Sequence, residues 1–253
     1  MSLEQVVVLL VAAAGAGWVD AVVGGGGLLQ LPALMVAGIP PVQAMATNKL
    51  SSVFGTTTAA ITYVRSTKLD RQVAIPAGAL AVLSSGLGAT AAVAISAEVL
   101  RPVVMVVLLG VAAFVTLRPA MGQVPKPHLR TNGRVVAAVA VGGVVIAFYD
   151  GIMGPGTGTF LIIAFTTILG LDFVNASATA KIINIGTNVG ALVVFGLQGH
   201  VLWALGLGMA VCNIAGARLG ARMALKRGAS FVRIVLLVVV AAMVTRLAWQ
   251  QFA

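Results

Sequence analysis

The sequence predicts an all-α, polytopic helical membrane protein that consists of two inverted repeats of about five segments each. Apolar residues make up 60% of the chain, charged residues only 9%, and the mean hydropathy is +1.07. A soluble domain carries about 25% charged residues, so this chain could not cover a water-facing surface and must face lipid. In addition, its polar motifs recur once, about 130 residues further along the chain.

Eight long apolar spans and two short ones are expected, since a membrane helix needs roughly 20 apolar residues. The long spans are residues 5–23, 43–64, 73–96, 101–118, 134–150, 174–197, 201–224 and 231–249. The short ones, 28–38 and 158–170, follow glycine-rich breaks. Each is too short to cross a bilayer as a straight helix, so we expect two broken or half-helices.

The longest polar connection runs from Arg118 to Arg134 and is rich in proline and charge, which is typical of a loop. It divides the chain into a first transmembrane repeat (1–120), a central cytoplasmic loop (121–133) and a second transmembrane repeat (134–253).

The two halves repeat the same polar positions. The segment Trp18–Gly24 matches Phe148–Gly154 at an offset of 130 residues, and Thr47–Lys49 matches Thr179–Lys181 at an offset of 132. Matched polar residues within apolar sequence are poor candidates for coincidence. The sequence therefore predicts a duplicated unit.

The basic residues predict how the two copies are oriented. With five segments in each half the second copy is inverted, and ten Lys and Arg residues fall on one side against two on the other; with four, the split is eight against four. The ten are Arg65, Lys68, Arg71, Arg118, Lys126, Arg130, Arg134, Lys226, Arg227 and Arg233, and the two are Arg101 and Arg246. Cytoplasmic loops collect Lys and Arg. This favours the inverted arrangement, a recurring transporter plan, with both termini on the non-cytoplasmic side.

Two glycine runs interrupt membrane segments at matched places and are candidate anion-binding sites. Glycine allows a ligand to approach the backbone closely. The free N–H groups and the dipole of a helix that begins after such a break favour an anion. Close helix packing is the alternative explanation. The candidate residues are Gly24, Gly25, Gly26, Gly27, Gly156, Thr157 and Gly158.

Lys49 and Lys181 lie a few residues inside long apolar spans. A lysine at membrane depth costs a few kcal/mol, so it must pair, serve function, or extend to the interface. Polar residues accompany both lysines, several of them on the same helix face by i, i+3 and i+7 spacing. These are Asn48, Ser52 and Thr56 beside Lys49, and Asn184 and Asn188 beside Lys181. Such a row of donors suits an oxyanion.

Asp20 and Asp150 each end a membrane span just before a glycine run. Burial disfavours the charged form of a carboxylate, so both are candidates for proton coupling. The alternatives are a salt bridge to the lysine of the same or the opposite copy, and hydrogen bonds from freed backbone N–H groups.

The net charge of +10 is explained by membrane topology, because the basic residues lie between apolar spans and aromatic residues are only 6%. Nucleic-acid binding is therefore not expected. The single cysteine, Cys212, makes no zinc site, and no P-loop or hydrolase motif is present. We expect no cofactor, no metal and no enzymatic activity.

Several of these motifs together resemble the TauE/SafE family of sulfite exporters, also called the TSUP family, over nearly the whole chain. The matching stretches are Gly24–Leu29, Pro32, Gly38–Pro41, Ala46–Leu50 and Gly216–Gly220. The resemblance implies a bacterial cytoplasmic (inner) membrane protein that moves sulfite, sulfonates, sulfoacetate or thiosulfate. It points to the first-half glycines, Asn48 and Lys49 as site residues.

The function expected is a secondary transporter of a small sulfur-containing oxyanion, working by alternating access, with protons as a candidate coupling ion. Its partners would be the small anion and the lipid bilayer; the sequence leaves the oligomeric state open. An anion channel could use the same elements, but it would show neither coupling to a gradient nor slow turnover, whereas a transporter would show saturation and coupling. An intramembrane enzyme would need a nucleophile–base or metal constellation.

Overall fold

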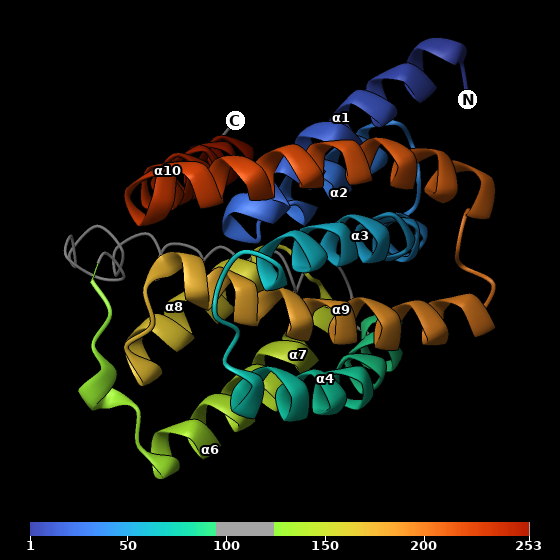
Figure 1. Cartoon of the computed structure of the whole chain (residues 1–253). Coiled ribbons are helices and arrows are strands. Elements are labelled where there is room, and N and C mark those ends of the chain that lie inside the picture. Colours follow the sequence, from blue (N-terminus) through green and yellow to red (C-terminus); the bar gives the residue numbers. More distant parts are fainter. Residues whose placement is uncertain (95–123, 253) are drawn as a thin grey trace.

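A computed structural model describes residues 1–94 and 124–252, and these ranges form helices with no β-strand among them (Figure 1). In chain order the elements are α1 (Leu3–Val23), α2 (Gly27–Val36), α3 (Pro41–Val64), α4 (Arg71–Ala92), η1 (Pro127–Leu129), α6 (Asn132–Ala140), η2 (Val141–Ile146), α7 (Ala147–Ile152), α8 (Thr157–Leu169), α9 (Phe173–Leu197) and α10 (Trp203–Phe252). The all-helical prediction is confirmed for these ranges.

Five segments of the described chain are long and apolar enough to cross a membrane: α1, α4, the continuous stretch Asn132–Ile152, α9, and Trp203–Val232 of α10. Helix α3 has the length, 24 residues, but not the apolar composition of these five, because it carries several buried polar side chains. The short helices α2 and α8 have 10 and 13 residues, as the sequence predicts. The expected span at 101–118 lies outside the described residues.

Local sequence explains where several helices begin and end. Helix α1 begins with a capping box between Ser2 and Gln5, and it ends at Gly24, whose φ is +77°. The Asp172 side chain accepts hydrogen bonds from the first N–H groups of α9. The label α10 covers two helices that meet at a kink at the non-helical Gly228; they account for most of the expected span 201–224 and for 231–249.

The described helices pack as two bundles. The first bundle contains α1, α2, α3 and α10; the second contains α4, α6, η2, α7, α8 and α9. In the first, α10 packs along both α1 and α3; in the second, α4 packs along α7 and α9. Each bundle therefore combines three consecutive segments of one sequence half with α10 or α4 of the other half.

Helices α3 and α9 lie side by side in opposite directions at the contact between the bundles (Figure 1). Thr67, just after α3, contacts Asn175 near the start of α9, whereas Thr56 contacts Asn188 further along α9. This antiparallel pair brings the polar strips of the two halves together.

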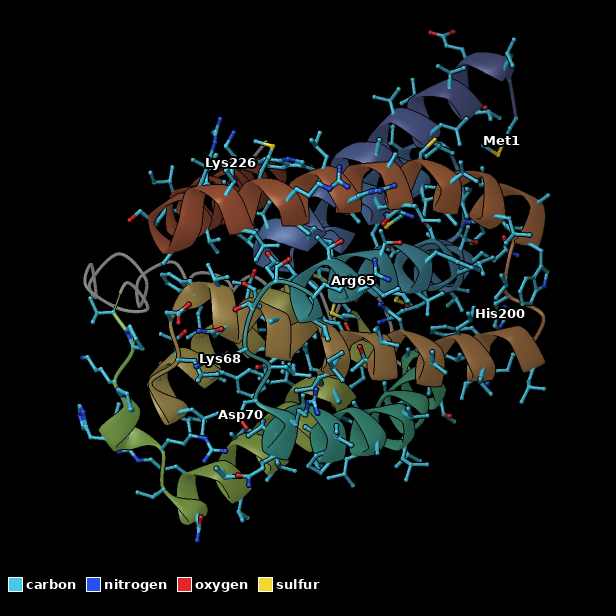
Figure 2. All side chains as sticks on the ribbon, in the orientation of Figure 1. Met1, Arg65, Lys68, Asp70, His200 and Lys226 are labelled. Atoms are coloured by element: carbon cyan, nitrogen blue, oxygen red, sulfur yellow. The ribbon has the colours of Figure 1, made fainter. Side chains whose placement is uncertain are left out.

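Lys68 and Lys226 lie toward one end of the described molecule, here called the basic end, and Met1 and His200 lie toward the opposite end (Figure 2). At the basic end Arg130 donates hydrogen bonds to the Asp70 carboxylate, which raises the pKa of the guanidinium above its ordinary value.

Candidate functional site

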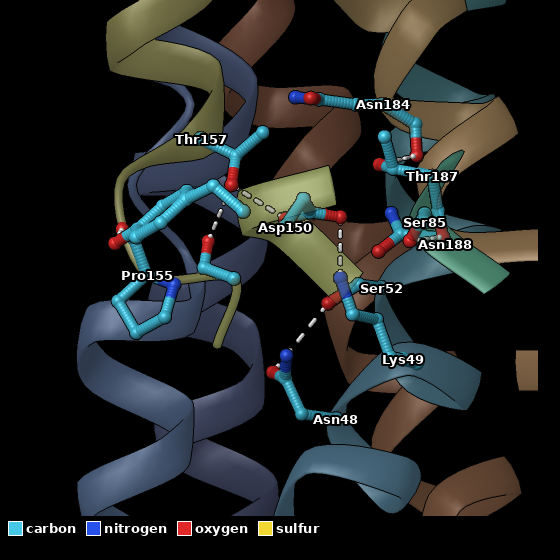
Figure 3. A network of polar contacts seen from close by, with 12 residues as sticks. Asn48, Lys49, Ser52, Ser85, Asp150, Pro155, Thr157, Asn184, Thr187 and Asn188 are labelled. Carbon is cyan, nitrogen blue, oxygen red and sulfur yellow. Dashed lines mark hydrogen bonds and ion pairs between the residues drawn. The ribbon is translucent and has the colours of Figure 1, made fainter. Parts of the chain in front are cut away.

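Lys49 lies on α3 and is 3% exposed, although it carries a charge. Its Nζ forms an ion pair with Oδ2 of Asp150, which is buried in the last turn of α7 (Figure 3). The hydroxyl of Thr157, at the start of α8, donates a hydrogen bond to the other carboxylate oxygen, Asp150 Oδ1.

Lys181 lies on α9 and is fully buried. Its Nζ lies 2.9 Å from Oδ2 of Asp20 and also donates to the Asp20 backbone carbonyl. Thr56 of α3 donates to the same carboxylate oxygen at 3.1 Å, and Asn188 donates to Thr56 at 3.4 Å.

The two ion pairs cross between the sequence halves. A lysine of the first half pairs with the aspartate of the second, and a lysine of the second half pairs with the aspartate of the first. Of the alternatives open for the aspartates, the salt bridge to the opposite copy is the one present. Removing one partner of a buried pair typically costs about 3–5 kcal/mol, because the other charge is left uncompensated.

The two glycine breaks touch each other beside these pairs. The Gly158 N–H donates to the Gly24 carbonyl at 3.1 Å, and Thr159 Oγ1 donates to the Val23 carbonyl at 2.8 Å. A Cβ on Gly24 would lie 2.2 Å from the Gly158 Cα. Close backbone packing therefore accounts for these two glycines in this structure.

Other predicted site residues line the same region. A Cβ at Gly27 would lie 3.7 Å from Asn48 Nδ2, and Asn48 Oδ1 accepts from Ser52 at 3.5 Å. Asn184 lies against Gly158, and its Oδ1 is buried with no hydrogen-bond partner among the described residues. The region thus contains two buried ammonium groups, several hydroxyl and amide donors, and one unused acceptor.

Among residues 1–94 and 124–252, no group of three or more His, Cys, Asp or Glu side chains lies close enough together to hold a metal ion.

Buried lysines beside broken membrane helices are thus the main feature of this site. A family model described as "Sulfite exporter TauE/SafE" matches residues 9–247. The chain belongs to the TauE/SafE family. The resemblance stated from the motifs is confirmed, and no solved structure shows a significant match.

Relatives in the TauE/SafE family cover nearly the same length. The chain is 38% identical over 239 residues to "Probable membrane transporter protein ORF9" of Sinorhizobium sp, covering 94% of this chain and 90% of that protein. It is 36% identical over 243 residues to "Probable membrane transporter protein YfcA" of Escherichia coli K12, covering 95% and 88%. A "Probable membrane transporter protein" of Haemophilus influenzae is 29% identical over 239 residues, covering 93% and 91%. With its apolar helices, this TauE/SafE member is a multi-pass membrane transporter.

The sequence reasoning did not single out a buried amide pair in this TauE/SafE chain. Asn213 of α10 donates to Gln30 of α2 at 3.1 Å, and both side chains are buried. Two glycines make room for Asn213. A Cβ at Gly17 would lie 2.2 Å from the Asn213 backbone oxygen, and a Cβ at Gly55 would lie 1.7 Å from its side-chain Oδ1. The available signal was a lone Asn and a lone Gln within apolar spans.

Proposed function

We propose that this protein is a secondary transporter of a small sulfur-containing oxyanion, such as sulfite, sulfoacetate, another organosulfonate or thiosulfate, that works by alternating access. The observation that carries the proposal is the pair of buried ammonium groups, Lys49 and Lys181, each beside a glycine break and a set of hydroxyl and amide donors. The family description and the relatives' names support the transporter class, and the family description supports the sulfur oxyanion.

Lys49 and Lys181 place two ammonium groups inside a largely apolar protein. An ammonium at membrane depth costs a few kcal/mol, so its retention indicates a partner or a task. The short helices α2 and α8 begin beside the pairs, and helix N-termini attract anions. From the first sequence half, Lys49, Asn48, Ser52, Thr56 and the Gly25–Gly27 run would bind the anion. From the second, Lys181, Asn184, Asn188, Gly156 and Thr157 would bind it.

We further propose that the two halves are inverted repeats, with the basic end in the cytoplasm of a bacterial cell and both termini on the opposite side. The antiparallel contact of α3 and α9 supports inversion. The positions of Lys68 and Lys226 away from Met1 support the orientation, since cytoplasmic loops collect basic residues.

A binding screen on the detergent-purified protein tests the substrate class. We expect one of sulfite, thiosulfate, sulfoacetate or taurine to raise the apparent melting temperature, while sulfate, phosphate and chloride do not, because a ligand bound to the folded form stabilises it. If chloride alone stabilises the protein and flux does not saturate, the anion channel replaces this proposal.

Proton coupling is proposed for Asp20 and Asp150, whose charges face the two lysines. If an aspartate carries a proton, transport should depend on pH, and Asp20→Asn or Asp150→Asn should flatten that dependence. Initial uptake rates into proteoliposomes at a series of pH values measure this. Wild-type pH profiles in both variants would exclude the role.

A further inference from the structure

Resting on the proposed transport, we propose that the substrate path runs between the two bundles rather than between the two sequence halves. We propose that each end of the path is held closed by one lysine–aspartate pair together with an apolar cluster. Close backbone contacts join the helices within each bundle. Between the bundles, Gly24 also meets Gly158 backbone to backbone beside the ion pairs, so the bundles would rock about this contact while the contacts on either side of it open in turn.

Within each bundle, helices meet backbone to backbone. A Cβ at Gly216 of α10 would lie 1.9 Å from the Ala14 carbonyl oxygen of α1. In the second bundle a Cβ at Gly190 of α9 would lie 2.0 Å from the Val82 carbonyl oxygen of α4. Such close approach maximises dispersion contact between membrane helices, so these helices move together.

Polar contacts inside the bundles also join the two sequence halves. Asn213 donates to Gln30 in the first bundle, and Ser85 of α4 donates to the Thr187 carbonyl of α9 at 2.8 Å in the second. Separating the two sequence halves would break both of these buried contacts. A rigid-body motion of the bundles leaves both intact.

The lysine–aspartate pairs lie between the bundles. Lys49 is in the first bundle and Asp150 in the second, whereas Lys181 is in the second and Asp20 in the first. An oxyanion can replace a carboxylate on a lysine, because both are anionic acceptors of charge-assisted hydrogen bonds. The substrate therefore competes directly for contacts that hold the bundles together.

Apolar clusters flank the polar middle of α3 and α9. On one side Tyr63 of α3 belongs to the same buried cluster as Phe165 and Phe173 of the second bundle. On the other side Leu50 of α3 shares a cluster with Phe195 of α9.

Each lysine lies next to a different one of these clusters. Lys49 directly precedes Leu50 in the cluster with Phe195, and Lys181 lies between Ala180 and Ile183 of the cluster with Tyr63. Opening one ion pair and its neighbouring cluster would admit the anion from that end, while the other pair keeps the opposite end closed.

Disulfide cross-linking separates the two possible motions. In a Cys212→Ala background, Gln30→Cys with Asn213→Cys links the sequence halves inside one bundle, and Thr67→Cys with Asn175→Cys links the end of α3 to α9 across the two bundles. Each protein is reconstituted, and sulfite or thiosulfate uptake is compared before and after oxidation by copper phenanthroline. We expect the first cross-link to leave the rate within twofold, and the second to lower it at least tenfold.

A block by the first cross-link, or free transport with the second, would overturn the proposal. Trp18→Cys with Met223→Cys supplies another link within the first bundle if the first variant does not fold.

A second readout needs no transport. Half-buried Ser52 is changed to Cys in the same background, and a membrane-impermeant thiol reagent is applied from either side of oriented vesicles. We expect Lys181→Ala to increase labelling at least tenfold from the basic end, and Lys49→Ala to do so from the opposite end.

Equal labelling from both sides in the two variants would contradict the assignment of one pair to each end. If wild type moves no oxyanion, the proposed function fails, while this labelling still decides whether the path exists.

Discussion

Changing Lys49 to Ala is expected to weaken binding of the transported oxyanion by about 10- to 100-fold and to abolish transport. A hydrogen bond to a charged group contributes about 1.5–3 kcal/mol, and about 1.4 kcal/mol corresponds to a tenfold change in affinity. The variant also leaves Asp150 buried without its cation. Isothermal titration with the anion found in the binding screen measures the loss.

A matched double variant separates binding from folding. Lys49→Ala with Asp150→Asn removes the orphaned charge, so the melting temperature should return toward wild type while the affinity stays low. Wild-type affinity in Lys49→Ala would remove this lysine from the site. Recovery of both properties in the double variant would show that the ion pair is purely structural.

The second large effect is expected from Gly24→Ala, which should greatly reduce the yield of folded, transport-competent protein. Gly24 has φ +77°, and a Cβ there would lie 2.2 Å from the Gly158 Cα, a backbone atom that cannot turn away. The two glycine breaks would have to separate, which would also displace the neighbouring Asp20 and its partner Lys181.

Gly38→Ala is the control, because Gly38 has φ +88° and nothing within 4 Å of the Cβ position. The left-handed conformation alone costs roughly 1–2 kcal/mol for a residue with a side chain. Gly38→Ala should therefore fold and transport at a lower melting temperature. Equal yields of Gly24→Ala and Gly38→Ala in size-exclusion chromatography would contradict the role of the glycine contact.

Much of the helical architecture could be predicted from local sequence. Apolar length predicted α1, α4 and α9, and the glycine breaks predicted that α2 and α8 would be short. These features depend on residues close together in the chain. The expected spans 201–224 and 231–249 lie on either side of the non-helical Gly228, whose φ of +72° a glycine adopts without strain.

The candidate site was predicted residue by residue, but its contacts were not. Lys49 and Asp150 are 101 residues apart, and Lys181 and Asp20 are 161 apart. The sequence left pairing within one copy and pairing between copies equally open. Only the packing of α3 against α9, and of the two glycine breaks against each other, brings each lysine to the aspartate of the other half.

By itself, the sequence determined that the chain is a helical membrane protein with a repeated set of lysine, aspartate and glycine positions, since hydropathy and motif spacing are properties of the chain alone. The tertiary structure decided that α4 and α10 exchange bundles, that the ion pairs join those bundles, and that Asn213 contacts Gln30. Every helix of this composition can bury its apolar surface against several neighbours or against lipid. Which neighbour it packs against depends on close contacts such as that between Gly216 and Ala14, and these appear only once the helices are assembled.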